Sequence, residues 1–302
     1  MARQPYVRNR YIYQPSLPGA IASCIVSFAL TVALSYQIRK YRTKYMIILA
    51  VGTAAESLGY VLRSLGASGR ESSFPLYLLM QLFIVLAPLA FMAALYIIFG
   101  RLVRRVGQEK ALIPPAWYAR LFVTCDILSF LIQGAGAGFI VSDNRTTAMA
   151  GKNTLIGGLA FGLLSFASFC VMAILLHLRV LKDKKHDAHF RPTGMHENWQ
   201  TIWIPLYIGM VAILVRTIFR LVEFSLGWFG KVNSTEWYLY VFDMVAMAFT
   251  AIAFIVYFPA RFGLDQSLDG VRGDVEMAAS PTGGSVTEKT SPAELVSRSP
   301  VL

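Results

Sequence analysis

The chain has 302 residues, of which 56% are hydrophobic and only 15% are charged. A soluble domain is closer to half apolar and a quarter charged, so this composition excludes an ordinary soluble protein and indicates an integral membrane protein. The formal net charge of +11 would suit a nucleic-acid partner. However, 13 of the 28 lysines and arginines lie in alternate loops between apolar segments, and this uneven distribution is typical of membrane topology and not of a nucleic-acid interface.

Seven apolar segments are each long enough to cross about 30 Å of hydrocarbon as a helix. They cover approximately residues 18–38, 45–65, 75–100, 117–140, 156–180, 201–228 and 237–260. None has the alternation of a half-buried strand, so the sequence predicts an all-α integral membrane protein, a seven-transmembrane helical bundle. We expect an extracellular N-terminal tail (1–16), a membrane domain (17–263) and a disordered cytoplasmic tail (264–302) rich in Ser, Thr, Gly and Pro.

The loops after spans one, three and five contain 13 lysines and arginines, whereas the intervening loops contain four. Cytoplasmic loops carry the excess of Lys and Arg, so the N-terminus is predicted outside and the C-terminus inside the cell. Two glycosylation sequons, Asn144-Arg-Thr146 and Asn233-Ser-Thr235, fall in predicted outside loops. Asn233 lies close to two spans, so we expect glycosylation at Asn144.

Charged side chains lie inside several spans. Arg216, Arg220 and Glu223 occupy one apolar stretch at helical spacing, which places all three on one face. An unpaired charge at mid-helix costs roughly 2.5–3.5 kcal/mol, so these residues should face the interior and pair, or line a wet cavity. The candidate ligand-binding residues are Glu56, Arg63, Asp126, Gln133, Arg216, Arg220, Glu223, Tyr240 and Asp243.

Ion pairs that only fix helix register are the alternative for any of these residues. Arg220 and Glu223, three residues apart, are the pair most typical of that role. Glu56, Asp126, Arg216 and Asp243 are better candidates for contacting a ligand head group. Neutralising Glu56 or Asp243 is expected to abolish activity while leaving surface expression intact.

Glycine, proline and tryptophan predict features of the bundle. The pairs Gly134-x-x-x-Gly138 and Gly158-x-x-x-Gly162 predict close helix contacts. Pro88 and Pro205 are expected to kink their helices and to open a cavity. The tryptophans near span ends are expected to anchor the interface with lipid head groups; they are Trp117, Trp199, Trp203, Trp228 and Trp237.

The sequence lacks the residues that ATP hydrolysis and metal-dependent catalysis require. The chain has no Walker A pattern, and only His177 among the four histidines lies in a span. A membrane zinc site needs several such ligands. We therefore predict no catalytic residues, no metal and no cofactor, and an enzyme is the least favoured class.

Six motifs occur in order along the chain. They are Tyr13-x-Pro15-Ser16; Glu56-x-x-Gly59-Tyr60-x-x-Arg63; Ala87-Pro88 with Tyr96 and Gly100-Arg101; Asp126 with Ser129, Gln133, Gly134 and Gly136; Arg216-x-x-Phe219-Arg220-x-x-Glu223-x-x-x-Gly227; and Glu236-x-x-x-Tyr240-x-x-Asp243 with Pro259. From about Tyr13 to Arg261 the chain resembles the fungal seven-span family of lipid-translocating exporters. That family is associated with sphingoid long-chain-base release and with resistance to aminosterols and other toxicants.

The resemblance implies a multi-pass protein of the plasma membrane, with internal membranes as the alternative, that exports or flips amphiphilic lipids or toxic amphiphiles. Its partners would be membrane lipids or amphiphilic small molecules. The alternative is a seven-span lipid sensor or receptor that signals to a cytoplasmic partner. The end of span three has Gly100-Arg101 where common receptors carry an Asp/Glu-Arg-Tyr motif, and span seven lacks Asn-Pro-x-x-Tyr. These differences disfavour the common receptor class but leave other sensors open.

Overall fold

The computed structural model describes residues 16–67, 74–106, 114–140, 144–184, 199–226 and 236–262. The chain divides into two units, Met1–Asp265 and Gln266–Leu302, and all the described residues belong to the first. Seven helices in these ranges are long and apolar enough to cross a membrane. The same ranges contain no strand, so the predicted all-α, seven-span fold is confirmed. The expected terminal tails lie almost entirely outside the described residues.

The helices follow the predicted spans in order. They are α1 (Leu17–Tyr41), α2 (Ile47–Ala67), α3 (Phe74–Val106), α4 (Pro115–Ile140), α5 (Arg145–Lys184), α6 (Trp203–Leu226), α7 (Glu236–Leu239) and α8 (Ala246–Val256). Short 3₁₀ turns, η1 (Lys44–Met46), η3 (Trp199–Ile202) and η5 (Pro259–Phe262), adjoin α2, α6 and α8. The last span contains α7, a π-helical segment η4 (Tyr240–Val245) and α8.

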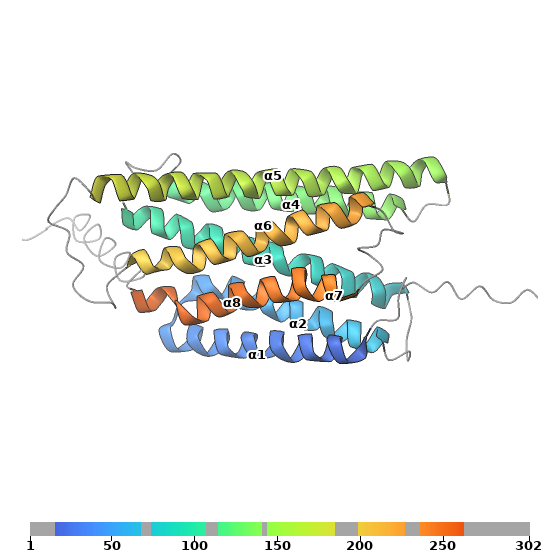
Figure 1. Cartoon of the computed structure of the whole chain (residues 1–302), viewed down its shortest axis with the longest axis horizontal. Helices are drawn as coiled ribbons and strands as arrows, with labels where there is room; N and C mark the ends of the chain where they lie inside the picture. Colours follow the sequence, from blue (N-terminus) through green and yellow to red (C-terminus); the bar gives the residue numbers. More distant parts are fainter. Residues whose placement is uncertain are drawn as a thin grey trace, which may run out of the picture. The chain divides into compact units, whose positions relative to one another are not determined.

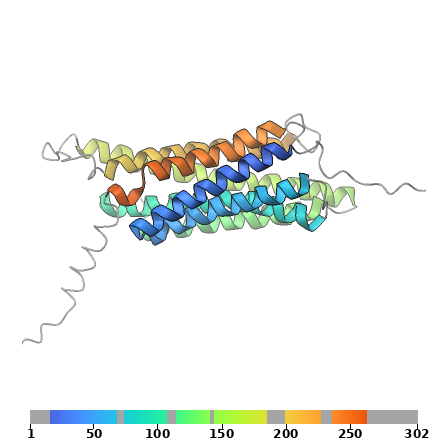
Figure 2. The same ribbon diagram turned by 90° about the horizontal axis from the view of Figure 1, so that it is seen from below.

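Neighbouring helices in the sequence are neighbours in space. Each helix from α1 to α5 packs against the next, and α6 packs against α5 and α8 (Figure 1). α8 also contacts α1, which runs diagonally between α2 and α8 in Figure 2. Because α3 contacts α6 as well, side chains from α3, α4, α5 and α6 meet in one interior region.

Aromatic rings fill much of the space between α3, α4 and α5. The Tyr96 ring lies 4.6 Å from Phe169 and 5.4 Å from Phe122, and Phe99 lies 5.3 Å from Phe169. All four side chains are buried. Such ring pairs contribute about 0.5–1.5 kcal/mol each beyond their burial. The rings therefore hold Tyr96 firmly in one position.

On α4, the close contact with α5 depends on Gly136 and not on the predicted pair Gly134 and Gly138. A Cβ atom at Gly136 would lie only 2.5 Å from the backbone nitrogen of Leu155. In contrast, a Cβ at Gly134 or Gly138 would have no atom within 4 Å. Residues two positions apart lie roughly 200° apart around a helix, so these two glycines point away from α5. The prediction that they mark a close contact is wrong.

The second glycine pair is placed as predicted. A Cβ at Gly158 would lie 2.9 Å from Gln133, and one at Gly162 would lie 2.6 Å from the Ser129 hydroxyl. α5 therefore passes very close to the face of α4 that carries Ser129 and Gln133.

One tryptophan and one proline differ from their predicted roles. Trp203 is buried, and its ring stacks on His177 with centroids 4.3 Å apart, so it is not an interfacial anchor. Trp117 and Trp237 are exposed, which suits the anchoring role. Pro205 is the third residue of α6, in the first turn, where the missing N–H breaks no helical hydrogen bond. The predicted kink at Pro205 is therefore wrong.

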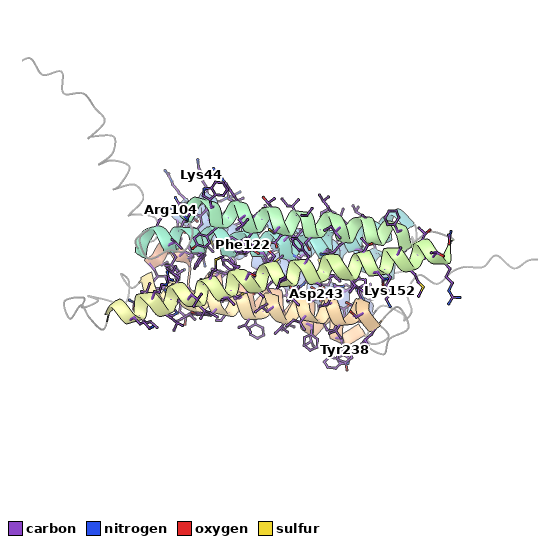
Figure 3. The ribbon with its side chains drawn as sticks, turned by 90° about the horizontal axis from the view of Figure 1, so that it is seen from above. Lys44, Arg104, Phe122, Lys152, Tyr238 and Asp243 are labelled. Carbon is purple, nitrogen blue, oxygen red and sulfur yellow. The ribbon has the colours of Figure 1, made fainter. Side chains whose placement is uncertain are left out.

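The basic residues remain segregated along the helices. Lys44 and Arg104 lie at one end of the helices and Lys152 lies at the other (Figure 3). The assignment of the Lys44 end to the cytoplasm stays a prediction from the positive-inside rule.

Glycosylation of Asn144 tests this orientation. Asn144 is exposed and precedes α5, and its side-chain oxygen accepts a hydrogen bond from the Thr146 N–H at 3.0 Å. α5 begins at Arg145, before the apolar segment of its span. At about 1.5 Å per helical residue, Asn144 lies on the order of 15 Å from the start of that apolar segment. We expect a glycosidase-sensitive mobility shift that Asn144→Gln removes and Asn233→Gln retains. A C-terminal tag accessible outside intact cells would overturn the orientation.

Candidate functional site

The charged stripe of α6 faces the interior, as its spacing predicts. Arg216 and Arg220 are 6% and 5% exposed. The Arg220 Nη1 donates to the Glu223 Oε2 at 3.3 Å, one helical turn away, so the predicted Arg220–Glu223 pair is confirmed. Buried charges of opposite sign thus compensate one another along a single helix.

Asp243 joins both arginines from the last span. Its Oδ1 accepts a hydrogen bond from the Arg216 Nε, and its Oδ2 accepts one from the Arg220 Nη2. Asp243 is itself buried. Together with Glu223, the group has two cations and two anions, so its charge is balanced inside the bundle.

The π-helical segment Tyr240–Val245 carries Asp243. A π-helix has more residues per turn than an α-helix, so it changes which side chains face a neighbouring helix, and such segments are frequent at functional sites. Here Asp243 faces the arginines of α6, while Phe242 stacks on Phe219 of α6 at 4.9 Å. The segment therefore fixes the last span to α6 by both a polar and an apolar contact.

Pro88 provides a further contact for Arg216. The N–H of each residue in an α-helix bonds to the carbonyl four residues earlier, but proline has no N–H. α3 continues through Pro88, so the carbonyl of Ile84 lacks its helical donor. The Arg216 Nη2 donates to this carbonyl at 3.1 Å. Pro88 therefore makes an acceptor available on α3 that helps to fix the guanidinium group.

Arg63 and Tyr240 meet on the α2 side of the bundle. The guanidinium carbon of Arg63 lies 5.6 Å from the centre of the Tyr240 ring, within the range of a cation–π interaction. The Tyr240 ring also stacks on Tyr60, with centroids 6.4 Å apart. These contacts connect α2 to the π-helical segment.

Glu56 differs from Glu223 and Asp243 in its contacts. It is 6% exposed and lies near enough to Asp243 and Arg216 to interact with them electrostatically. Among the described residues, however, its carboxylate makes no hydrogen bond or ion pair. A buried carboxylate without a partner does not contribute to helix register in the way that Glu223 or Asp243 does.

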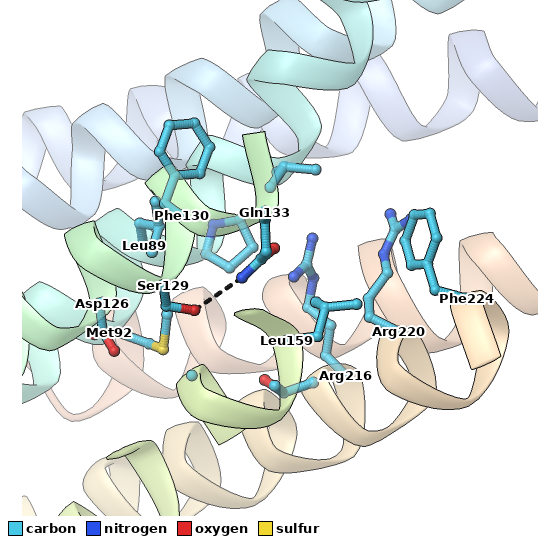
Figure 4. Close-up of a pocket in the computed structure, with 14 residues that line it drawn as sticks. Leu89, Met92, Asp126, Ser129, Phe130, Gln133, Leu159, Arg216, Arg220 and Phe224 are labelled. Atoms are coloured by element: carbon cyan, nitrogen blue, oxygen red, sulfur yellow. Dashed lines mark hydrogen bonds between the residues drawn. The ribbon is translucent and has the colours of Figure 1, made fainter. Parts of the chain in front are cut away.

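A cavity of about 70 Å³ lies between α3, α4, α5 and α6. Its polar lining comes from α4 and α6, namely Asp126, Ser129, Gln133, Arg216, Thr217 and Arg220. Figure 4 shows Ser129 and Gln133 on one wall and the two arginines on the other. The rest of the wall is apolar and includes Pro88 and Phe224.

Hydrogen bonds within α4 and to α3 and α5 fix the polar side chains of the α4 wall. The Tyr96 hydroxyl donates to the Asp126 Oδ2 at 2.8 Å. The Ser129 hydroxyl donates to the Gly158 carbonyl at 2.7 Å and accepts from the Gln133 Nε2 at 2.9 Å. These bonds fix the orientation of the carboxylate and of the amide that line the cavity.

The nine predicted site residues fall into three groups. Asp126, Gln133, Arg216 and Arg220 line the cavity; Glu223 and Asp243 pair with its arginines; Glu56, Arg63 and Tyr240 lie toward α2. Tyr96, Ser129 and Pro88 also belong to the site; they occur in the sequence motifs, and Pro88 was expected to open a cavity, but none was predicted as a ligand-binding residue. Ser129 lies three residues after Asp126 and four before Gln133, and this helical spacing is a signal that reveals it. Within the described residues, no three His, Cys, Asp or Glu side chains are grouped so that they could hold a metal ion.

Known proteins resemble this chain over most of the membrane region. Residues 49–266 match the model of the family described as RTA1 like protein. The Saccharomyces cerevisiae protein RTM1 is 31% identical over 211 residues, which are 70% of this chain and 66% of the relative. Protoporphyrin uptake protein 1 of the same yeast is 32% identical over 206 residues, 68% of this chain and 65% of the relative.

A more distant relative is named as a lipid transporter. The sphingoid long-chain base transporter RSB1 of Saccharomyces cerevisiae (strain Lalvin EC1118 / Prise de mousse) is 24% identical over 234 residues, 68% of this chain and 61% of the relative. The chain thus spans less than two thirds of the length of each of these three relatives. No solved structure matches the chain. The family match over residues 49–266, in a helical bundle with seven membrane-capable helices, shows that this multi-pass membrane protein belongs to the RTA1-like family, the fungal lipid-translocating exporter family that its motifs indicate.

Proposed function

We propose that this protein is a transporter, and not an enzyme, that moves amphiphilic lipids or toxic amphiphiles across the plasma membrane and thereby confers resistance to them. The observation that carries the proposal is the charged cavity inside an otherwise apolar bundle. An amphiphile needs polar surroundings for its head group while its tail remains in lipid. The yeast relatives named for protoporphyrin uptake and sphingoid long-chain base transport support a lipid-like substrate.

The charge pairing divides the acidic residues by role. Asp243 and Glu223 are engaged by the arginines of α6, so their charges are already compensated. Glu56 and Asp126 are buried carboxylates that form no ion pair among the described residues. In the proposed function, these two carboxylates interact with the head group during transport, while Asp243 and Glu223 hold the arginines in place.

Glu56→Gln in purified, reconstituted protein tests the proposal. Liposomes containing the protein receive a labelled sphingoid base in one leaflet, and its exchange between leaflets is followed with and without an imposed proton gradient. We expect protein-dependent exchange for the wild type and at least a tenfold slower rate for Glu56→Gln. The amide keeps the shape of the carboxylate and removes a buried charge that forms no ion pair among the described residues, so the variant should fold as well as the wild type.

The matched control is Glu197→Gln, the same substitution in the loop between spans five and six. This variant should exchange lipid at the wild-type rate. Thermal melting and gel filtration of all three proteins establish folding. Folded wild type that exchanges no lipid in either condition would contradict transport and favour the lipid sensor. A ligand-dependent change in a cytoplasmic partner, measured without flux, would support that alternative.

A further inference from the structure

One oxygen of the Asp126 carboxylate is buried in the cavity wall and has no hydrogen-bond partner in the part of the chain that the structure describes. Asp126 is 4% exposed, and its Oδ2 accepts the hydrogen bond from Tyr96. Its Oδ1 is also buried and has no hydrogen-bond partner among the described residues. A buried acceptor left unsatisfied is unfavourable, so this oxygen is suited to a donor that a ligand supplies.

Tyr96 holds the carboxylate in this orientation. The Tyr96 side chain is fully buried, and its ring packs against three phenylalanines at 4.6–6.2 Å. Rotation of the ring would require these neighbours to move. The hydroxyl therefore keeps Oδ2 engaged and leaves Oδ1 as the unsatisfied acceptor of a residue that lines the cavity.

The charge distribution around the cavity favours a cation at this oxygen. Arg216 and Arg220 are already bound by Asp243, and no Lys, Arg or His among the described residues forms an ion pair with Asp126. Gln133 adds to the acceptor character of the same wall, because its amide nitrogen is engaged by Ser129 and its carbonyl oxygen makes no hydrogen bond to the described residues. The α4 wall thus offers two acceptors and an uncompensated negative charge.

We propose that Asp126 is the specificity-determining residue of the cavity, that it binds the ammonium group of a long-chain amine through Oδ1, and that Tyr96 is its positioning residue. This inference rests on the proposed function, since it concerns the ligand of the same cavity. The cavity of about 70 Å³ has room for a small head group but not for a long alkyl chain. Discrimination therefore concerns the charge and size of the head group: an N-acylated amine loses the charge and adds bulk, and a carboxylate repels Asp126.

Binding to the full-length protein in lipid nanodiscs tests this assignment without requiring transport. The probes are hexadecylamine, N-acetylhexadecylamine and palmitic acid. Wild type should bind the amine at least tenfold more tightly than the other two, since hydrogen bonds to charged groups are among the stronger ones. Asp126→Asn should lose at least tenfold in amine affinity, with the N-acetyl affinity changed less than twofold.

Tyr96→Phe keeps the ring packing and removes only the hydroxyl, so it should lower the preference for the amine severalfold without changing N-acetyl binding. Asp126→Glu should retain part of the preference, and Ser168→Ala, on the exposed face of α5, should retain all of it. A purely structural role for Tyr96 would alter the binding of all three probes together, which would contradict its assignment as a positioning residue.

The inference and the proposed function fail in different ways. A wild type that binds the amine selectively but exchanges no lipid would contradict transport and leave Asp126 as the specificity residue. Lipid exchange by a wild type without amine preference, or by Asp126→Asn with the wild-type preference, would overturn the assignment of Asp126 and leave transport intact.

Discussion

Asp243→Asn is expected to prevent stable folding. The substitution removes the carboxylate that accepts hydrogen bonds from both Arg216 and Arg220, and it leaves buried positive charge without compensation. Removal of one partner from a buried ion pair typically costs about 3–5 kcal/mol, which is a large fraction of the roughly 5–15 kcal/mol by which native proteins are stable. The amount of protein in the membrane fraction and the melting temperature of purified protein measure the effect.

The sequence led us to expect that neutralising Asp243 would leave surface expression intact, and the contacts of Asp243 change this expectation. Neutralising this residue should reduce surface expression, whereas Glu56→Gln should not, because Glu56 forms no ion pair among the described residues. Glu223→Gln should have an intermediate effect, since Arg220 retains Asp243. A second substitution, Arg220→Met in the Asp243→Asn background, should recover part of the lost stability, because it removes one of the two buried cations that Asp243 binds. Asp243→Asn that melts at the wild-type temperature would show that the pairing does not stabilise the fold.

Local periodicity predicted much of this site. The spacing of Arg216, Arg220 and Glu223 was enough to place them on one inward face, and the i, i+3 pair followed from helix geometry. The seven helices followed from apolar length, because a segment that crosses lipid must satisfy its own backbone hydrogen bonds. These features depend on residues within one helix.

Contacts between distant segments were not predictable in the same way. The sequence gives no sign that Tyr240–Val245 is π-helical, and that geometry determines the partners of Asp243. Likewise, Pro88 was expected to bend α3, and its contribution to the site is the free carbonyl of Ile84 that Arg216 binds. Both depend on how separate helices pack, which the spacing of residues within one span does not specify.

The glycines of α4 are a further example: the sequence did not predict which of them contacts α5. Three glycines alternate at positions 134, 136 and 138, and a motif of small residues spaced by four favours the first and last. Only the position of α5 decides which of them is in contact. That position places the backbone of Gly151 and Leu155 against Gly136.

Gly136→Ala is therefore expected to disrupt the packing of α4 on α5, although it adds a single methyl group. The new Cβ would lie 2.5 Å from the Leu155 nitrogen and 2.8 Å from the Gly151 carbonyl oxygen. Both are backbone atoms, so only a shift of a whole helix relieves the clash. Overpacking of this kind typically costs about 1–3 kcal/mol.

The shift would also change the cavity, because Ser129 and Gln133 of α4 face Gly158 and Gly162 of α5 across the same contact. We expect Gly136→Ala to lower the melting temperature and to weaken the binding of hexadecylamine. Gly134→Ala and Gly138→Ala are matched controls, since their methyl groups meet no atom within 4 Å, and both should behave as wild type. Equal melting temperatures for all three alanine variants would contradict the packing of α4 against α5 at Gly136, and with it the geometry of the cavity wall that carries Asp126.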